Sequence, residues 1–329
     1  MQKLLTILGP TSVGKTGLAL RLAKKFNGEL VACDSRQVYK KLDIGTGKMP
    51  DVDVSCQSSA IRRKKGNGFW EIEGIKIWMY DVADPKRQYT VYDFVKDASK
   101  VISGVERRDK LPIIVGGTGL YLKAILSGLP NLAIPLDLDL RKKLEKLSLK
   151  KLQEKLQKIS PKKWEKMNNS DRQNPRRLIR AIEIASTDFT SEESLRATVR
   201  GGFNTLKIGL TAPRESLYQR IDERVVSRID QGMVDEAKSL HKSGLSFKRM
   251  RQLGLEYGVL ANYLEGKITS EQELVKILQG KIHGYARRQI TWFKKEKNIL
   301  WFDITDQNFP ANVEKEAAKW YYQVDAAKG

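Results

Sequence analysis

Residues 9–16 read Gly-Pro-Thr-Ser-Val-Gly-Lys-Thr, which is the residue spacing of a loop that cradles phosphate groups. The loop follows a short apolar run, residues 4–8, and precedes apolar residues that recur at helical spacing. In such a strand–loop–helix unit the backbone N–H groups point at phosphate oxygens, Lys15 adds a positive charge, and the Thr16 hydroxyl can reach a Mg²⁺ ion. The sequence therefore predicts a phosphate or diphosphate site, and the motif leaves open whether the phosphate belongs to ATP.

A carboxylate, Asp34, follows the next apolar run along the chain and is succeeded by Ser35, Arg36 and Gln37. The carboxyl end of a parallel strand beside the phosphate loop is where α/β proteins bind their ligands. Asp34 could coordinate Mg²⁺, accept a proton as a general base, or cap the start of a helix. The spacing alone does not separate these roles.

A second glycine-rich turn, Val-Gly-Gly-Thr-Gly-Leu-Tyr at residues 115–121, comes directly after another apolar run. A nucleotide hydrolase often carries an aspartate for Mg²⁺ at the end of such a strand. Here the strand ends in glycine, which argues against routine ATP hydrolysis, although Asp81 could substitute for the missing acid.

Three arginines, Arg220, Arg224 and Arg228, recur at four-residue steps beside an apolar row, so one helix face would carry all of them. Arginines in this arrangement could clamp phosphate oxygens through paired hydrogen bonds. They could equally form a solvated face paired with acids of the same helix. We expect one arginine of the row, rather than all three, to have a functional role.

Short apolar runs that alternate with helical patterns must position these groups. The predicted strands are residues 4–8, 30–33, 75–80, 112–115, 206–210 and 299–302. Continuous apolar runs are typical of buried parallel strands, so we expect an α/β fold, a P-loop NTPase-like parallel sheet with flanking helices. The basic run at 62–65, followed by Gly-Asn-Gly, predicts an exposed loop or a hairpin.

Residues 136–195 break this alternation, because leucines recur there at three- and four-residue steps without a convincing strand. We expect a helical insertion domain within a core formed by residues 1–135 and 196–329. Such an insertion could close over a substrate, or it could be a passive decoration of the core.

The charge balance points to a polyanionic partner. The 329 residues include 60 Lys+Arg and 39 Asp+Glu, a formal net charge of +21. Such an excess favours nucleic-acid binding through the phosphate backbone, although solubility alone could explain part of it. Two cysteines and two histidines without a metal-ligand cluster argue against a structural zinc site. Without a signal-peptide pattern or a long apolar stretch, we expect a cytoplasmic protein that does not interact with membranes.

Taken in order along the chain, these motifs resemble those of the tRNA dimethylallyltransferases. The resemblance extends from residue 9 to about residue 293 and includes Asp-Ile-Gly-Thr-Gly-Lys at 43–48, Leu-Gly-Leu-Glu-Tyr at 253–257 and Tyr-Ala-Arg-Arg-Gln-Ile-Thr-Trp-Phe at 285–293. It implies transfer of a dimethylallyl group from its diphosphate to N6 of the adenosine at position 37, in tRNAs that read codons beginning with U. The family's Ile-Gly-Tyr-Lys-Glu is replaced here by Leu-Gly-Leu-Glu-Tyr, a departure that affects the rim of the site.

The resemblance also assigns roles to single residues. Asp34 would be the general base, with Lys15 and Thr16 as further catalytic residues and Mg²⁺ held at Thr16. The diphosphate would bind at Gly9, Thr11, Ser12, Val13, Gly14, Lys15, Thr16 and Arg220. The anticodon stem-loop of the tRNA would contact Asp34, Ser35, Arg36, Gln37, Thr118, Arg141, Gln173, Asn174, Arg176, Arg177, Arg287, Arg288 and Gln289. A monomer is expected.

Three alternatives remain at this point. An isopentenyltransferase that acts on free AMP or ADP would need neither the basic excess nor the insertion. A small-molecule kinase would use ATP at the same loop, but the missing acid after Val115 disfavours it. A non-catalytic RNA-binding protein with a relic phosphate loop is disfavoured because Lys15, Thr16 and Asp34 are all intact.

Overall fold

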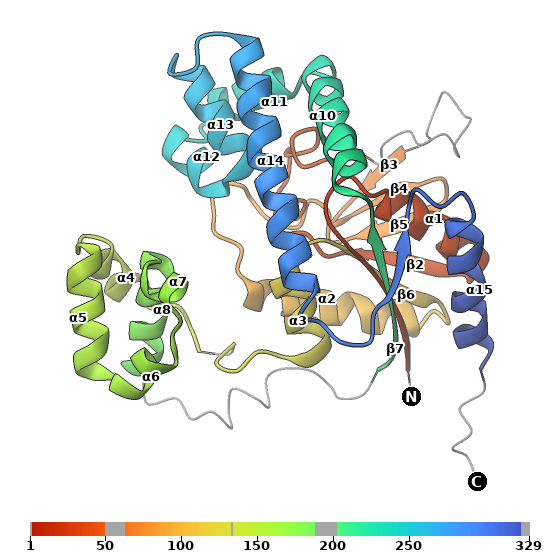
Figure 1. Cartoon of the computed structure of the whole chain (residues 1–329), viewed down its shortest axis with the longest axis horizontal. Coiled ribbons are helices and arrows are strands. Elements are labelled where there is room, and N and C mark those ends of the chain that lie inside the picture. The colour runs from red at the N-terminus through yellow and green to blue at the C-terminus, as the bar shows by residue number, and fades with distance from the viewer. Residues whose placement is uncertain (1, 50–62, 133, 188–202, 324–329) are drawn as a thin grey trace. The chain divides into compact units, whose positions relative to one another are not determined.

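The computed structural model describes residues 2–49, 63–132, 134–187 and 203–323 of the chain (Figure 1). The chain divides into two compact units, one formed by residues 1–123 with 201–329 and the other by residues 124–200. The predicted insertion, residues 136–195, lies within the second unit. Residues 188–195 of that prediction, and Arg62 of the basic run, lie outside the described residues.

The first unit is built on a mixed eight-stranded sheet with the strand order β3-β4-β5-β2-β6-β1-β7-β8. Six of these strands run parallel to their neighbours, from β5 through to β8. The strands are β1 (Lys3–Leu8), β2 (Gly28–Ala32), β3 (Arg63–Gly66), β4 (Phe69–Ile72), β5 (Ile75–Trp78), β6 (Leu111–Gly116), β7 (Asn204–Thr211) and β8 (Leu300–Asp303). All six predicted strands are present in this sheet.

The central strands are buried along nearly their whole length, as their continuous apolar sequences predict. The register pairs Leu8 of β1 with Gly116 of β6, and Ala32 of β2 with Val115 of β6. Because these strands are parallel, their carboxyl ends meet at one edge of the sheet. The loops after β1, β2 and β6 therefore begin side by side.

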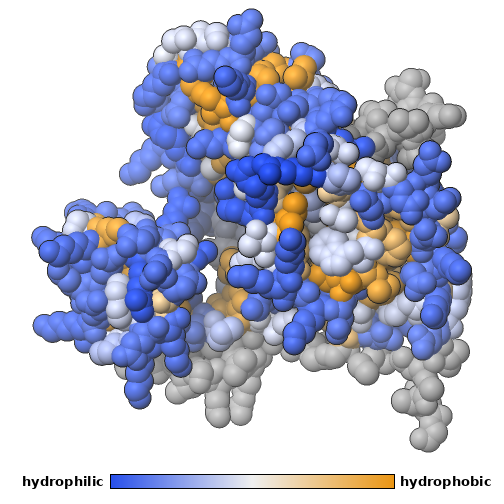
Figure 2. Space-filling model, in the orientation of Figure 1, coloured by the Kyte–Doolittle hydropathy of each residue, from blue (hydrophilic) through white to orange (hydrophobic). Residues whose placement is uncertain are grey.

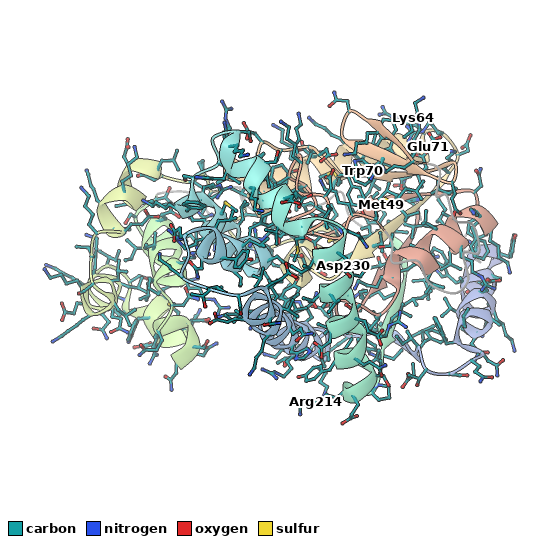
Figure 3. All side chains as sticks on the ribbon, turned by 90° about the horizontal axis from the view of Figure 1, so that it is seen from above. Met49, Lys64, Trp70, Glu71, Arg214 and Asp230 are labelled. Carbon is teal, nitrogen blue, oxygen red and sulfur yellow. The ribbon has the colours of Figure 1, made fainter. Side chains whose placement is uncertain are left out.

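The basic run forms a hairpin, one of the two predicted alternatives, and it adds antiparallel strands to one edge of the predicted parallel sheet. Strand β3 pairs antiparallel with β4, and β4 pairs antiparallel with β5. Lys64 lies opposite Glu71 across the hairpin (Figure 3). Such a short connection between neighbouring strands produces antiparallel pairing, because a parallel pair needs a longer crossover.

Helices flank this sheet and continue beyond it. Helix α1 packs on β2 and β6, whereas α10 packs on α14 and α11. Leu217, Ile221 and Val225 form the buried stripe of α10, whose ends are marked by Arg214 and Asp230 in Figure 3. The helices are α1 (Lys15–Lys25), α2 (Val91–Glu106), α10 (Arg214–Asp230), α11 (Met233–Lys242), α12 (Phe247–Leu253), α13 (Leu255–Leu264), α14 (Glu271–Phe293) and α15 (Phe309–Tyr322). Helix α3 (Gly119–Ser127) crosses the boundary between the units.

The second unit is helical in its described residues. Its helices are α4 (Leu138–Leu144), α5 (Leu149–Ile159), α6 (Pro161–Lys166), α7 (Asn169–Arg172) and α8 (Pro175–Ala185). Side chains of Asp137, Ser148, Asn168 and Asn174 cap four of these helices by accepting backbone N–H groups. Its small core is centred on Leu152, Leu156, Leu178 and Ile182. The surface of this unit in Figure 2 is predominantly hydrophilic.

Among the described residues, no helix combines the length and the apolar character that crossing a membrane requires.

Candidate active site

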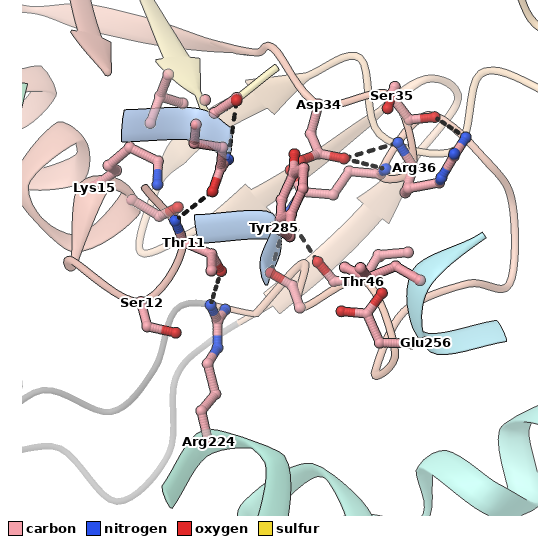
Figure 4. Close-up of a pocket in the computed structure, with 18 of the residues that line it drawn as sticks. Thr11, Ser12, Lys15, Asp34, Ser35, Arg36, Thr46, Arg224, Glu256 and Tyr285 are labelled. Atoms are coloured by element: carbon pink, nitrogen blue, oxygen red, sulfur yellow. Dashed lines mark hydrogen bonds between the residues drawn. The ribbon is translucent and has the colours of Figure 1, made fainter. Parts of the chain in front are cut away.

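A cavity of about 350 Å³ opens where the loops after β1, β2 and β6 meet (Figure 4). The predicted residues that line it are Thr11, Ser12, Gly14, Lys15, Thr16, Asp34, Ser35, Arg36, Gln37, Arg288 and Gln289. Gly116 and Gly117 line the same cavity. Motifs that are far apart in the sequence are thus gathered at the carboxyl edge of the sheet, where α/β proteins bind ligands.

The phosphate loop has the tight geometry that its glycines allow. Gly9 has a φ of +144°, and a Cβ atom there would lie 2.4 Å from the carbonyl oxygen of Leu210. Gly14 is left-handed, with a φ of +75°, and directly precedes α1. Inside the loop, the Ser12 hydroxyl is buried and has no hydrogen-bond partner among the described residues. A buried hydroxyl without a partner in a nest of backbone N–H groups suits an anionic oxygen.

Gln289 lies behind this loop rather than on an open surface. Its Oε1 accepts the backbone N–H of Thr11 at 2.9 Å, and its Nε2 donates to the carbonyl oxygen of Gly117 at 2.9 Å. A Cβ atom at Gly117 would lie 2.2 Å from Gln289 Nε2, so only glycine admits this contact. Gln289 is buried and joins the phosphate loop to the second glycine-rich turn. Its predicted contact with tRNA stays a prediction.

Asp34 caps a tight turn and does not start a helix. Its Oδ1 accepts the backbone N–H groups of Arg36 and Gln37, at 2.7 and 3.3 Å. Within the described residues, Asp34 Oδ2 has no hydrogen-bond partner, so this oxygen is available to a ligand in the cavity. Beside it, the Ser35 backbone N–H donates to the Thr118 hydroxyl at 3.2 Å.

The arginine row of α10 faces the cavity loops and does not form a solvated face. Arg220 donates from Nε to the Ser12 carbonyl oxygen at 2.9 Å, while Arg224 reaches the Thr11 hydroxyl at 3.4 Å. Arg228 is buried and donates to the Gly45 carbonyl oxygen at 3.3 Å. Arg224 and Arg228 line the cavity. Two arginines of the row thus lie at the cavity, and the expectation that one of the three has a functional role stays a prediction.

An acid from the 253–257 motif completes this side of the cavity. Glu256 lies 3.6 Å from Arg228 and lines the cavity together with Tyr285. Burial raises the pKa of Glu256, and the charge of Arg228 offsets only part of that effect. The cavity therefore combines several cations with two carboxylates, Asp34 and Glu256.

Asp81 does not replace the acid missing after Val115. Its two carboxylate oxygens accept hydrogen bonds from Lys48 Nζ at 2.6 Å and from Trp70 Nε1 at 2.6 Å. Lys48 is fully buried. Asp81 thus neutralises a buried cation, and it is not among the residues that line the cavity.

The donor set at the cavity suits a metal ion that is held mainly by its ligand's phosphates. Among the described residues, no group of three or more His, Cys, Asp or Glu could hold a metal ion. Mg²⁺ is commonly bound through one or two protein oxygens, water and substrate phosphates. The Thr16 hydroxyl, which lines the cavity next to Lys15, fits that mode of binding.

Two family models match the chain. The model described as IPP transferase matches residues 37–296, and the model described as Isopentenyl transferase matches residues 2–58. The chain belongs to the IPP transferase family. This is a family of prenyltransferase enzymes, and the cavity that gathers the phosphate loop and Asp34 is the candidate active site.

Several curated relatives resemble this IPP transferase over most of their length. tRNA dimethylallyltransferase 2 of Treponema denticola is 40% identical over 296 residues, which is 89% of this chain and 92% of the relative. The tRNA dimethylallyltransferase of Halalkalibacterium halodurans is 36% identical over 319 residues, 95% of this chain and 94% of the relative.

Solved structures share the fold. A tRNA isopentenylpyrophosphate transferase from Bacillus halodurans matches with a TM-score of 0.67 and 33% identity, covering 98% of this chain and 97% of that one. A eukaryotic dimethylallyltransferase, solved acting on tRNA, matches with a TM-score of 0.76 and 25% identity, covering 97% of this chain and 78% of that one.

The remaining predicted site residues of the IPP transferase lie outside the cavity lining. Gly9 and Val13 belong to the phosphate loop, and Arg220 donates a hydrogen bond to its Ser12 carbonyl oxygen. Thr118 accepts a hydrogen bond from the Ser35 backbone N–H beside Asp34. Arg287 is exposed on α14 and donates to the Tyr218 hydroxyl at 3.0 Å. The predicted tRNA-contacting residues in the second unit are Arg141, Gln173, Asn174, Arg176 and Arg177.

Within the second unit these five residues have different surroundings. Asn174 caps α8, and Arg177 is paired with Asp171. Arg141 pairs with the buried Glu183 through two hydrogen bonds, at 2.5 and 2.7 Å. Gln173 and Arg176 are exposed.

Sequence reasoning missed several residues that the cavity uses. Thr46, Gly47, Tyr80, Glu256 and Tyr285 line it, although none was singled out as a site residue. The glycines at 45 and 47 could have indicated that the neighbouring Thr46 lies in a tight turn, and the Arg-x-x-x-Arg spacing indicated an arginine row on α10. The spacing does not reveal which face of α10 meets the cavity loops.

Proposed function

We propose that this chain transfers a dimethylallyl group from dimethylallyl diphosphate to N6 of adenosine 37 in tRNAs that read codons beginning with U. The observation that carries the proposal is one cavity holding both the phosphate loop and Asp34 Oδ2, an oxygen with no partner among the described residues. Relatives named tRNA dimethylallyltransferase support the reaction class.

In this reaction a bond forms between N6 and the allylic carbon, while the bond between that carbon and the diphosphate oxygen breaks. The exocyclic amine is a weak nucleophile because its lone pair is delocalised into the ring. Asp34 Oδ2 accepts the proton that the nitrogen must lose. Oδ1 remains bound to the turn, so the carboxylate stays in place as the proton arrives.

The diphosphate leaves with its charge stabilised by the phosphate loop. Lys15, the backbone N–H groups of the loop and the Ser12 hydroxyl face that charge, and Arg224 stands at the loop's edge. Mg²⁺ held at Thr16 would supply further stabilisation of the leaving charge. Arg220 acts indirectly, because it holds the Ser12 carbonyl oxygen and so positions the phosphate loop.

The RNA is the polyanion that the net charge of +21 favours. The target adenine must leave the stacked anticodon loop to reach the cavity, and Ser35, Arg36 and Gln37 would hold it there. Exposed cations at Arg176, Arg177, Arg287 and Arg288 would contact RNA phosphates. We propose that the protein does so as a cytoplasmic monomer.

A labelled transfer assay tests the proposal. The protein is incubated with labelled dimethylallyl diphosphate and Mg²⁺, with unmodified tRNA and free AMP in parallel reactions. Label on tRNA alone is the expected result. Label on AMP alone would identify an adenylate isopentenyltransferase, and no label on either acceptor would overturn the proposal.

A further inference from the structure

Glu236 on α11 is held by four hydrogen bonds to the loop of residues 43–48 and its support. Its Oε2 accepts the backbone N–H groups of Asp43 and Ile44, both at 2.8 Å. Its Oε1 accepts the Gly45 N–H at 3.0 Å and the Tyr257 hydroxyl at 2.5 Å. Hydrogen bonds to a charged acceptor are stronger than neutral ones, so this carboxylate fixes the first half of the loop.

The rest of the loop has little room to move. A Cβ atom at Gly45 would lie 2.7 Å from the Tyr257 hydroxyl, and one at Gly47 would lie 1.8 Å from Arg228. Beneath the loop, the buried Lys48 donates to the Tyr39 carbonyl oxygen, Asp43 and Asp81. Glu236 therefore anchors a loop that is packed from several sides.

This loop in turn fixes the orientation of the Gln37 amide. Gln37 Nε2 donates to the carbonyl oxygens of Thr46 and Gly47, at 3.2 and 3.0 Å. Carbonyl oxygens can only accept hydrogen bonds, so the amide nitrogen must face the loop and the amide oxygen must face away. Gln37 Oε1 has no hydrogen-bond partner among the described residues, and Gln37 lines the cavity.

The cavity thus offers two acceptors from one turn, Gln37 Oε1 and Asp34 Oδ2. An exocyclic NH₂ group has two hydrogens and matches two acceptors. A purine with a keto oxygen at C6 would place an acceptor against the acceptor Gln37 Oε1. Both oxygens would then lack a hydrogen-bond donor, which costs binding free energy in a desolvated site.

We propose that Glu236 is a positioning residue that, through the loop of residues 43–48, holds Gln37 as an acceptor, and that Gln37 thereby selects a 6-aminopurine as the target base. The inference rests on the proposed function, which it deepens by giving a residue pair that reads the amine. Gln37 touches the base, whereas Glu236 acts through the loop.

The test measures binding to anticodon stem-loop RNAs that carry adenosine, purine riboside or inosine at the target position, without dimethylallyl diphosphate. The wild-type protein should bind the adenosine RNA about ten-fold more tightly than the purine-riboside RNA, which lacks the amine, and inosine should bind no better than purine riboside. Gln37→Met should bring the adenosine preference close to one. Glu236→Gln replaces one of the two acceptor oxygens by an amide N–H₂, which then faces at least one backbone N–H donor of the loop, so it should lower the preference several-fold.

Three controls separate positioning from general damage. Asp235→Asn removes the neighbouring acid of the same helix turn, an exposed side chain paired with Lys238, and should leave the preference unchanged. Tyr257→Phe removes a single donor to Glu236 and should shift the preference in the same direction by a smaller factor. Thermal unfolding checks that each variant is folded at the assay temperature.

Kinetics give a second readout. Glu236→Gln should raise KM for the RNA while leaving KM for dimethylallyl diphosphate unchanged, because the phosphate loop does not contact Glu236. Folded Glu236→Gln and Gln37→Met proteins that keep the wild-type preference would overturn the inference. Failure of the proposed function would instead appear as absence of transfer by the wild-type protein, which the binding measurements do not depend on.

Discussion

The cavity of the first unit and the surface of the second unit hold their positive charges in different ways. At the cavity of the first unit and its phosphate loop, Arg220, Arg224 and Arg228 bind backbone carbonyl or hydroxyl oxygens, and Arg228 is buried. In the second unit, Arg176 and most lysines point into solvent. Cations fixed in advance suit a compact anion such as a diphosphate, since no ordering cost remains at binding. Mobile surface cations suit a long polyanion, which gains from counterion release whatever the detailed geometry.

Some arginines of the second unit do not point freely into solvent. Arg141 and Arg180 both pair with Glu183, whose side chain is only 2% exposed. Arg180 also donates to the carbonyl oxygens of Asn131 and Ile134. A buried carboxylate needs such partners, so Arg141 stabilises the fold of its unit in addition to any contact with RNA.

The largest predicted effect is on the chemistry in the first unit. Asp34→Asn keeps the Oδ1 acceptor for the turn but removes the proton acceptor, so the transfer rate should fall by about 10²–10⁴-fold. Single-turnover kinetics with tRNA and labelled dimethylallyl diphosphate measure this, and tRNA affinity should fall by no more than about ten-fold, because Asp34 Oδ2 is one of two acceptors for the amine. A rate close to that of the wild type would contradict the general-base role.

A core substitution tests whether the second unit contributes to RNA binding. Leu156 is fully buried in the core of that unit, so Leu156→Ala should lower its stability by about 2–5 kcal/mol. We expect weaker tRNA binding with unchanged affinity for dimethylallyl diphosphate, measured by titration of each ligand. Gln157→Ala, at an exposed and uncharged neighbouring position, is the matched control. An equal loss of affinity for tRNA and for dimethylallyl diphosphate would show that the second unit does not contribute to RNA binding alone.

The sequence predicted what local motifs encode. The residue spacing at 9–16 and the position of Asp34 after an apolar run locate the phosphate loop and the carboxylate, because strand ends and glycine turns are local features. Gln289 is hydrogen-bonded to Thr11, from which it is separated by 278 positions in the chain. Glu236 is hydrogen-bonded to Asp43, at a separation of 193 positions. No local pattern fixes such pairs. The arginine row was visible, but the face of α10 that meets the sheet is set by tertiary packing.

The third prediction concerns the pH dependence of the loop at residues 43–48. Burial alone would raise the pKa of Asp43, but Lys48 and Lys65 outweigh that effect and lower it. A carboxylate with a lowered pKa in the folded state stabilises the protein above its unfolded pKa, and this contribution is lost as the pH falls through the folded pKa. Asp43→Asn should therefore cost about 1–3 kcal/mol at neutral pH.

Thermal unfolding at several pH values checks this. The difference between wild type and Asp43→Asn should shrink as the pH falls below the ordinary carboxylate range of about 4 and through the lowered pKa of Asp43 in the folded protein. Asp235→Asn, which changes an exposed acid, serves as the control and should show little difference at any pH. A difference that stays constant down to acidic pH would mean that the Asp43 charge does not hold the loop.

The smallest effect is predicted for the exposed arginines of α8, where the contrast between free and engaged cations can be measured within one helix turn. Arg176 is exposed with no ion pair among the described residues, whereas its neighbour Arg177 is paired with Asp171. Arg176→Gln should weaken tRNA binding a few-fold and lower the slope of log affinity against log salt by about 0.7–0.9, the loss of one phosphate contact. Arg177→Gln should lower that slope by less, because Asp171 already competes for its charge. Equal slopes for the two variants would show that pairing with Asp171 of α7 does not reduce the contribution of Arg177 to RNA binding. The contrast between fixed and exposed cations would then hold only for the cavity.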